Sequence, residues 1–186
     1  MRGIVRRPSP IARKTGRTGR PDLQHKVTAP ISVGCAVVTV SDSKTPATDL
    51  TGRILAEGLA RSGHRVHGRV VVTDDAGKIR RAVKRGLRGP RVAAVITNGG
   101  TGITSRDVTF EAVEPMLEKR LDGFGELFRA LSFRQIGPSA LMSRALAGTV
   151  GRKVVIMLPG SPRAAELALK KLLLPELGHI AQQLSC

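Results

Sequence analysis

Residues 91–107 read RVAAVITNGGTGITSRD, and this stretch carries the strongest evidence for the fold class. Its first part, Arg91–Thr97, is almost entirely apolar and has the length of a strand, as expected for a strand buried on both faces of a parallel sheet. A glycine-rich loop begins at Asn98 and leads toward a predicted helix. A buried strand, a loop and a helix in this order indicate a βαβ unit, so we expect an α/β domain.

The same alternation extends toward the amino terminus. An apolar, β-branched run predicts a strand at Val33–Val40, a second strand is expected at Arg65–Val72, and a helix is expected after each of them. The first helix is expected over Thr51–Ser62, with Thr51 as its N-cap, and the second over Ala76–Arg88.

The alternation also extends toward the carboxyl terminus. Helices are predicted at Thr109–Arg120 and Gly123–Arg134, and a buried strand at Lys153–Leu158. A helix that begins at Ser161-Pro162 and a last helix that begins at Pro175 complete the pattern. Together these elements predict a three-layer α/β sandwich with a mostly parallel sheet.

Length and composition are those of one globular domain with an added basic segment. The chain has 186 residues, of which 41% are hydrophobic and 24% charged. No apolar run approaches the roughly 18 residues that a membrane span requires. Residues 1–30 contain eight basic residues, one acidic residue and four prolines, without hydrophobic periodicity. We therefore expect a disordered basic tail over 1–30 and one domain over 31–186.

Cysteine usage and charge limit the classes of function. Cys35 and Cys186 lie far apart and have no metal-ligand spacing, so neither a disulfide scaffold nor a zinc module is expected, and a reducing cytoplasm fits. The net charge of +17 favours phosphorylated or polyanionic ligands. The chain has no Trp, no Tyr and four Phe, which are few aromatic side chains for stacking on single-stranded nucleic acid. Nucleic-acid binding through the basic tail is therefore a minor alternative.

Three of the predicted strands end in loops rich in glycine or hydroxyl groups. In an open parallel sheet, ligands bind beyond the carboxyl ends of the strands, where backbone N–H groups and helix starts can hold an anion. The loop residues are Ser41 and Asp42 after the first strand, Gly99, Gly100, Thr101 and Gly102 after the third, and Pro159, Gly160 and Ser161 after the last. The glycine loop fits neither the Walker A nor the dinucleotide-binding pattern, and a simple structural turn is its alternative interpretation. The residues thus predict a phosphate site of another type.

Two carboxylates accompany these loops. Asp74 follows the second strand, and Asp107 follows the glycine loop. A carboxylate beside a phosphate is unfavourable unless Mg²⁺ or a proton-transfer step lies between them, so both are candidate Mg²⁺ ligands. The structural alternative is that Asp74 caps the helix at Ala76 and Asp107 caps the helix at Thr109.

Four segments resemble a known family. They are TVSDS at 39–43, GGTGITSRDVTFEAVEPML at 99–117, FGELFRALSFRQIGPSALMSRALAG at 124–148 and LPGSPRAAELAL at 158–169. These segments are similar to molybdenum cofactor biosynthesis proteins of the MoaB/MogA family, most closely to the MoaB branch. The resemblance covers residues 31–184 and implies the molybdopterin-binding, MogA-like fold.

The resemblance implies that the domain binds molybdopterin and adenylylates its terminal phosphate with Mg-ATP, releasing pyrophosphate. It assigns catalysis and Mg²⁺ binding to Asp74 and Asp107. It assigns ATP and molybdopterin binding to Ser41, Asp42, Gly99, Gly100, Thr101, Gly102, Pro159, Gly160 and Ser161. It also implies a homotrimer or homohexamer. Because Phe110 stands where many adenylylating relatives have proline, the alternative is a non-catalytic molybdopterin-binding or scaffold protein of the same pathway.

A cluster of apolar side chains bears on the assembly. Phe124, Leu127, Phe128 and Leu131 recur at helical spacing, with Phe133 close by. Such a stripe faces the core by default, but aromatic side chains are also enriched at subunit interfaces. The sequence alone therefore leaves two interpretations of this stripe, burial in the core of the domain and contact with another subunit.

Overall fold

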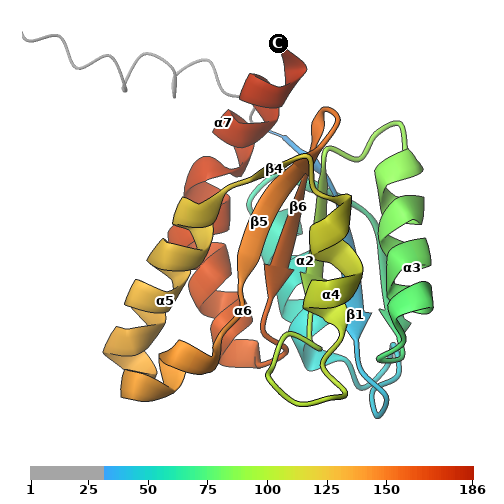
Figure 1. Ribbon diagram of the computed structural model, residues 1–186. Coiled ribbons are helices and arrows are strands. Elements are labelled where there is room, and N and C mark those ends of the chain that lie inside the picture. Colours follow the sequence, from blue (N-terminus) through green and yellow to red (C-terminus); the bar gives the residue numbers. More distant parts are fainter. Residues whose placement is uncertain (1–31) are drawn as a thin grey trace, which may run out of the picture.

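The computed structural model describes residues 32–186, which fold into one α/β domain (Figure 1). The prediction of a disordered tail over 1–30 lies outside the described residues. None of the helices in 32–186 has the length and apolar character that crossing a bilayer requires.

A six-stranded sheet with the order β2-β1-β3-β6-β5-β4 forms the middle layer. The strands are β1 (Gly34–Val40), β2 (Arg65–Val72), β3 (Ala94–Asn98), β4 (Lys119–Arg120), β5 (Leu146–Val150) and β6 (Lys153–Leu158). The pairs β1–β2, β1–β3 and β3–β6 are parallel, whereas β5 runs antiparallel to both β6 and β4. The predicted three-layer, mostly parallel architecture is therefore confirmed.

Helices cover both faces of the sheet. One face carries α2 (Leu50–Arg61), α5 (Asp122–Ile136), α6 (Pro162–Ala168) and α7 (Leu174–Ser185), and the other carries α3 (Ala76–Arg88) and α4 (Thr109–Val113). In Figure 1, α5 and α7 lie to the left of the strands and α3 to the right. Each face buries its own apolar cluster, built around Leu55, Leu59 and Phe128 on one side and Ile79 and Val83 on the other.

The N-cap of the first helix lies two residues before the predicted one. Asp49, not Thr51, caps α2, and its carboxylate accepts the N–H of Gly52 over 2.8 Å. Asp49 is buried, and it also accepts from the Thr39 hydroxyl and from Arg69. A carboxylate with three donors is a better helix cap than a threonine hydroxyl. Two of these donors come from distant strands, so the position of the cap depends on tertiary contacts.

The region after the glycine loop differs most from the prediction. The helix expected over 109–120 ends at Val113, continues as a short 3₁₀ helix, η1 (Glu114–Met116), and gives way to β4. Pro115 lies in η1, where it cannot donate a helical hydrogen bond. The strand β5 was not predicted. It is joined to β6 by a tight turn at Gly151, whose φ is 56°, and the two strands form an antiparallel hairpin.

The carboxyl-terminal helices form one continuous helical segment. The predicted boundary near Pro175 is a single π-helical turn, η3 (Leu169–Leu173), which connects α6 to α7. Pro175 lies in the first turn of α7. A π-helical turn absorbs the missing proline N–H without ending the helix.

Candidate functional site

The loops after β1, β2, β3 and β6 meet at one edge of the sheet, the lower edge in Figure 1. A cavity of about 510 Å³ lies among them, and a hollow of about 390 Å³ adjoins it. These two spaces share Val40, Ser41, Gly100 and Asp107. Their linings include every predicted site residue: Ser41, Asp42, Asp74, Gly99, Gly100, Thr101, Gly102, Asp107, Pro159, Gly160 and Ser161. The fold therefore gathers residues that are up to 120 positions apart in the chain, from Ser41 to Ser161.

The glycine loop is held in a conformation that other residues adopt poorly. Gly99 and Gly100 have φ values of 94° and 62°. The Thr109 side chain donates to the carbonyl of Gly99 over 2.9 Å, and its backbone N–H donates to the carbonyl of Gly100 over 2.9 Å. A Cβ on Gly99 would lie 2.2 Å from the carbonyl oxygen of Val40. These glycines are thus required by the protein's own packing and turn geometry, whatever ligand approaches them.

Asp107 is fixed at the end of this loop by Thr104. Its carboxylate accepts the Thr104 hydroxyl over 2.6 Å and the Thr104 N–H over 2.9 Å. The Thr104 side chain is the main reason that the pKa of Asp107 lies below its ordinary value. The helix α4 has no side-chain cap, so Asp107 does not cap it. The carboxylate is charged and partly open to the cavity.

Asp74 has the opposite electrostatic character. Burial, followed by the charges of Asp42 and Asp107, raises its pKa above the ordinary value. Asp42 itself pairs with Arg106, which lowers the pKa of Asp42. The N-cap of α3 is the next residue, Asp75, whose carboxylate accepts the N–H of Lys78 over 2.7 Å. The side chain of Asp74 is therefore available to the site.

The loop after β6 closes the cavity against β1 and α2. The Gly160 carbonyl accepts the Thr51 hydroxyl over 2.8 Å, and the Lys44 amine lies 3.5 Å from the same oxygen. A Cβ on Gly160 would come within 3.0 Å of the Gly99 Cα, so the two glycine loops touch. Ser161 caps α6 by accepting the N–H of Ala164, as predicted.

Sequence reasoning missed two parts of the cavity. Lys44 lines it and, within residues 32–186, is the one Lys or Arg in the lining. Its position directly after the SDS stretch was the available signal. The second missed part is a wall from α5 and the following 3₁₀ helix, η2 (Gly137–Met142). That wall consists of Phe128, Ser132, Ile136, Ser139, Met142 and Ser143, and nothing in their local sequence marks them as facing a loop edge.

The carboxylates form a small set of oxygen donors. Within residues 32–186, no group of three or more His, Cys, Asp or Glu side chains is arranged to hold a metal ion. Asp74 and Asp107 nevertheless interact electrostatically and border the same hollow. Mg²⁺ commonly takes one or two protein carboxylates and completes its shell with water and phosphate oxygens, so this donor set fits Mg²⁺.

The geometry agrees with the comparison to known proteins. Residues 36–179 match the family described as a probable molybdopterin binding domain. The chain belongs to this family. The match runs from within β1 to the middle of α7, and so includes all the loops around the cavity.

Individual members of the molybdopterin-binding family are similar over nearly their whole length. A molybdenum cofactor biosynthesis protein B from Bacillus cereus is 52% identical over 162 residues, which is 87% of this chain and 96% of that protein. The crystal structure of a molybdenum cofactor biosynthesis protein B superposes with a TM-score of 0.82 at 52% identity, covering 84% of this chain and 98% of that one. A tungsten cofactor synthesizing protein, MoaB, from Pyrococcus furiosus gives a TM-score of 0.76 at 33% identity, covering 83% and 98%. The resemblance stated from the sequence is confirmed.

Proposed function

We propose that this protein binds molybdopterin in the cavity at the carboxyl edge of the sheet and adenylylates its terminal phosphate with Mg-ATP. The observation that carries the proposal is the meeting of a glycine loop, one lysine and two carboxylates around the cavity and the hollow that adjoins it. Family membership supports the pterin as the ligand, and the names of the relatives support the pathway, molybdenum cofactor biosynthesis.

The reaction needs positioning and charge neutralisation more than a nucleophilic side chain. An oxygen of the molybdopterin phosphate attacks the α-phosphorus of ATP, a new P–O bond forms, and the bond between the α-phosphorus and the bridging oxygen breaks. Pyrophosphate leaves with the electron pair of that bond. The attacking phosphate is ionised at neutral pH, so the protein has no proton to remove from it.

The chain's own residues would hold the phosphates on one side of the cavity. Backbone N–H groups of Gly100 and Thr101 would donate to phosphate oxygens, and the start of α6 at Ser161 would favour negative charge. Lys44 would neutralise a phosphate, since it is the cation in the cavity lining. The apolar wall at Phe128 and Met142 would contact the pterin body.

The carboxylates would act on the other side. Asp74 and Asp107 would hold Mg²⁺ together with phosphate oxygens, and bound Mg²⁺ would offset the charge that develops during phosphoryl transfer. The raised pKa of Asp74 supports this role, because its cause includes two neighbouring carboxyls whose excess negative charge a cation would relieve. Asp42 would hold Arg106 and, through its bond to the Asp74 N–H, position that loop.

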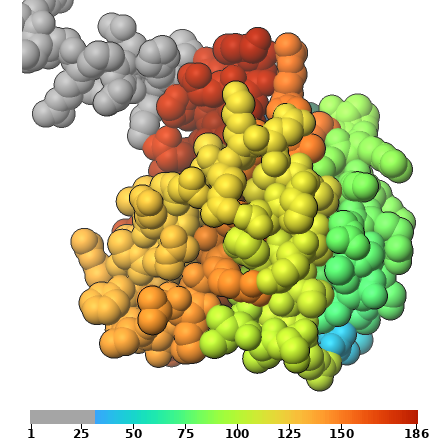
Figure 2. Space-filling view, in the orientation of Figure 1, coloured from blue at the N-terminus to red at the C-terminus, as the bar shows by residue number. Residues whose placement is uncertain are grey.

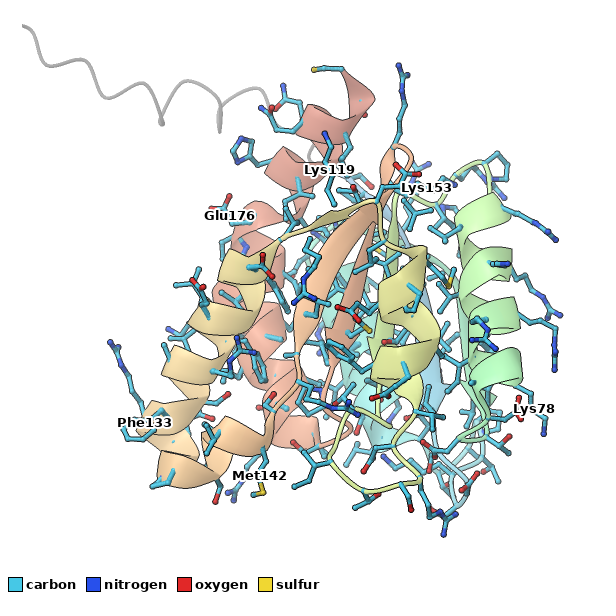
Figure 3. All side chains as sticks on the ribbon, viewed as in Figure 1. Lys78, Lys119, Phe133, Met142, Lys153 and Glu176 are labelled. Atoms are coloured by element: carbon cyan, nitrogen blue, oxygen red, sulfur yellow. The ribbon has the colours of Figure 1, made fainter. Side chains whose placement is uncertain are left out.

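We also propose a homotrimer or homohexamer. An apolar patch of α5 and η2 supports self-association: Leu127, Phe133, Ile136, Leu141 and Met142 are each at least half exposed. Figure 3 shows Phe133 and Met142 together at the lower left of the molecule. Patches of this kind are typical of subunit interfaces. The presence of two free thiols among the described residues supports a reducing cytoplasm as the compartment.

The deciding experiment measures pyrophosphate release and binding on the same protein. The protein is incubated anaerobically with ATP, Mg²⁺ and molybdopterin, and pyrophosphate is assayed, while equilibrium dialysis measures bound molybdopterin without ATP. Release that requires all three components supports adenylylation. Binding without release identifies a non-catalytic molybdopterin-binding protein, and the absence of both contradicts the proposal.

A further inference from the structure

The strand β2 forms a long open edge of the sheet. It has eight residues, Arg65–Val72, and within residues 32–186 it pairs with β1 alone. The strand at the other edge, β4, has two residues. Short edge strands limit pairing with other chains, because they present few free backbone groups. The edge at β2 lacks this protection.

A groove of about 580 Å³ runs between β2 and α3, and its lining shares no residue with the cavity or the hollow at the glycine loop. In the register of the sheet, Ala36 lies beside Gly68 and Val38 beside Val70, so Gly68 and Val70 face the α3 side. Val70 is 38% exposed, and a Cβ on Gly68 would meet no atom within 4 Å. The helix α3 packs against β1 and β3 through Ile79 and leaves this strip of β2 uncovered. The floor of the groove is therefore apolar and open.

The wall of the groove is strongly basic. The helix α3 reads AGKIRRAVKRGLR, with six basic residues and no acidic residue. Arg81 and Arg85 line the groove, with Lys78 at the end nearer the loop edge, as Figure 3 shows. Among the residues that the structure describes, no Asp or Glu lines this groove. Neither arginine forms an ion pair with a carboxylate of residues 32–186. In the space-filling view of Figure 2, the surface of α3 is the green right flank of the molecule.

We infer that this groove binds an extended acidic segment of a partner protein, which adds to the sheet as a further strand beside β2. The free backbone groups of β2 supply main-chain hydrogen bonds, as in other cases where a peptide joins an exposed sheet edge next to a helix. Alternate side chains of the segment point toward α3, where apolar ones cover Val70 and acidic ones meet Arg81 and Arg85.

Charge and shape argue against other occupants. Residues 1–30 of this chain contain eight basic residues and one acidic residue, so the groove would repel them. A second copy paired edge to edge would bring the same basic lining against itself, with no acidic residue in that lining to match it. A nucleic acid would satisfy the arginines, but it would leave the apolar floor uncovered and the backbone of β2 unpaired.

The test uses the full chain and synthetic probes. The first probe, the Glu/Val peptide, is a fluorescent peptide of eight residues to match β2, Glu-Thr-Val-Thr-Glu-Thr-Val-Thr, which places Glu and Val on the same face of a strand. The second has the same sequence with alternate backbone nitrogens methylated, which keeps the charge and removes hydrogen-bond donors. The third replaces Glu by Lys, and the fourth is a single-stranded oligothymidylate. Fluorescence anisotropy at low salt measures binding, and amide hydrogen exchange locates it.

The variant for this test is Arg81→Glu combined with Arg85→Glu, both on the exposed surface of α3. Its control is Arg152→Glu combined with Lys171→Glu, which changes the net charge equally at exposed positions outside the groove. Circular dichroism checks that both remain folded. We expect the groove variant to bind the Glu/Val peptide at least about tenfold more weakly, and the control to bind it within a few-fold of the parent.

The outcomes separate the possibilities. The inference is supported if the Glu/Val peptide binds, the methylated and Lys peptides do not, and the amides of β2 are protected while those of β4 are unchanged. It is overturned if the methylated peptide binds equally, if the groove variant retains full binding, or if the oligothymidylate is bound in preference. It is also overturned if β2 is already protected without peptide and sedimentation shows that Arg81→Glu with Arg85→Glu changes the assembly.

Discussion

The backbone N–H of Asp74 donates to a carboxylate oxygen of Asp42 over 3.0 Å, and this bond ties the end of β2 to the end of β1. The carboxyl groups of both residues border the same hollow, together with that of Asp107. Arg106 pairs with Asp42 and lowers its pKa, whereas the pKa of Asp74 is raised. The site thus contains one carboxyl group that is neutralised by an arginine and one that is destabilised in its charged form.

We predict that Asp74→Asn stabilises the fold at neutral pH and abolishes pyrophosphate release. The folded-state pKa of Asp74 is raised, so its charged form opposes folding once the pH exceeds that pKa. Removing the charge therefore raises the Tm at pH 7, and the gain disappears as the pH falls below the ordinary value of 3.8. Thermal melts across this pH range measure it. Asp75→Asn is the matched control, since Asn caps a helix as well as Asp does. A lower Tm for Asp74→Asn at pH 7 would contradict the electrostatic assignment.

Asp107→Asn should leave the fold intact and reduce adenylyl transfer by about 10²–10³, the usual cost of one charge-stabilising group. The Asn side chain keeps an oxygen that can accept from Thr104. Because the pKa of Asp107 is lowered in the folded state, we also expect a small loss of stability above pH 3.8, and this difference vanishes at lower pH. Steady-state kinetics and thermal melts check both parts. Asp122→Asn, on an exposed residue away from the cavity, should change neither.

We predict that Lys44→Met weakens the binding of ATP and molybdopterin without unfolding the protein. The Lys44 amine contacts the Thr51 hydroxyl at 3.4 Å and the Gly160 carbonyl at 3.5 Å, so its loss removes weak internal contacts. One hydrogen bond to a charged group is worth about 1.5–3 kcal/mol, which corresponds to a loss of affinity of about tenfold or more. Isothermal titration calorimetry measures this loss. Lys171→Met is the control, and equal affinities for the two variants would exclude Lys44 from the phosphate site.

His64 should make the fold less stable in mild acid. Its ring nitrogen Nδ1 accepts the N–H of Val33 over 3.1 Å, and burial lowers its pKa below the ordinary 6.5. Between the folded-state pKa and 6.5, His64 is protonated in the unfolded chain and neutral in the folded chain. The free energy of unfolding therefore decreases as the pH drops from 6.5 toward the folded-state pKa. Urea unfolding between pH 7.5 and about 5 tests this. His64→Asn, which keeps an acceptor and does not titrate, should flatten the profile, whereas His67→Gln on the surface should reproduce the parent.

Some apolar side chains of α5 lie in the core and others on the surface. We expect substitutions of the first kind to reduce stability and those of the second kind to weaken self-association. Phe128 is 1% exposed, so Phe128→Ala should cost about 3–5 kcal/mol of unfolding free energy. Phe133 is 58% exposed, so Phe133→Asp should leave the folded protomer intact and weaken self-association. Analytical ultracentrifugation and denaturant melts distinguish these effects. An unchanged sedimentation coefficient for Phe133→Asp would exclude this patch from the interface.

Much of the architecture follows from local patterns. Local patterns at Val33–Val40, Arg65–Val72 and Lys153–Leu158 predicted three strands within a residue of their bounds. The first and the third are buried and apolar along their length, as strands inside a parallel sheet must be. The loops at their ends predicted where ligands would bind, since parallel strands place their carboxyl ends at one edge. The family motifs around Gly99–Asp107 then supplied the ligand that composition and spacing left unspecified.

Other features depend on contacts between distant segments, which no local pattern contains. Asp49, and not the predicted Thr51, caps α2. Its carboxylate is held by Thr39 and Arg69, which lie on two different strands and donate hydrogen bonds to it. Whether Phe128 or Phe133 is buried depends on how α5 is rotated against the sheet. The raised pKa of Asp74 arises from burial and from carboxyl groups that the fold brings to it, whereas the lowered pKa of Asp107 comes mainly from Thr104, a local partner. The open edge at β2 likewise exists because the order of the strands places β2 last in the sheet.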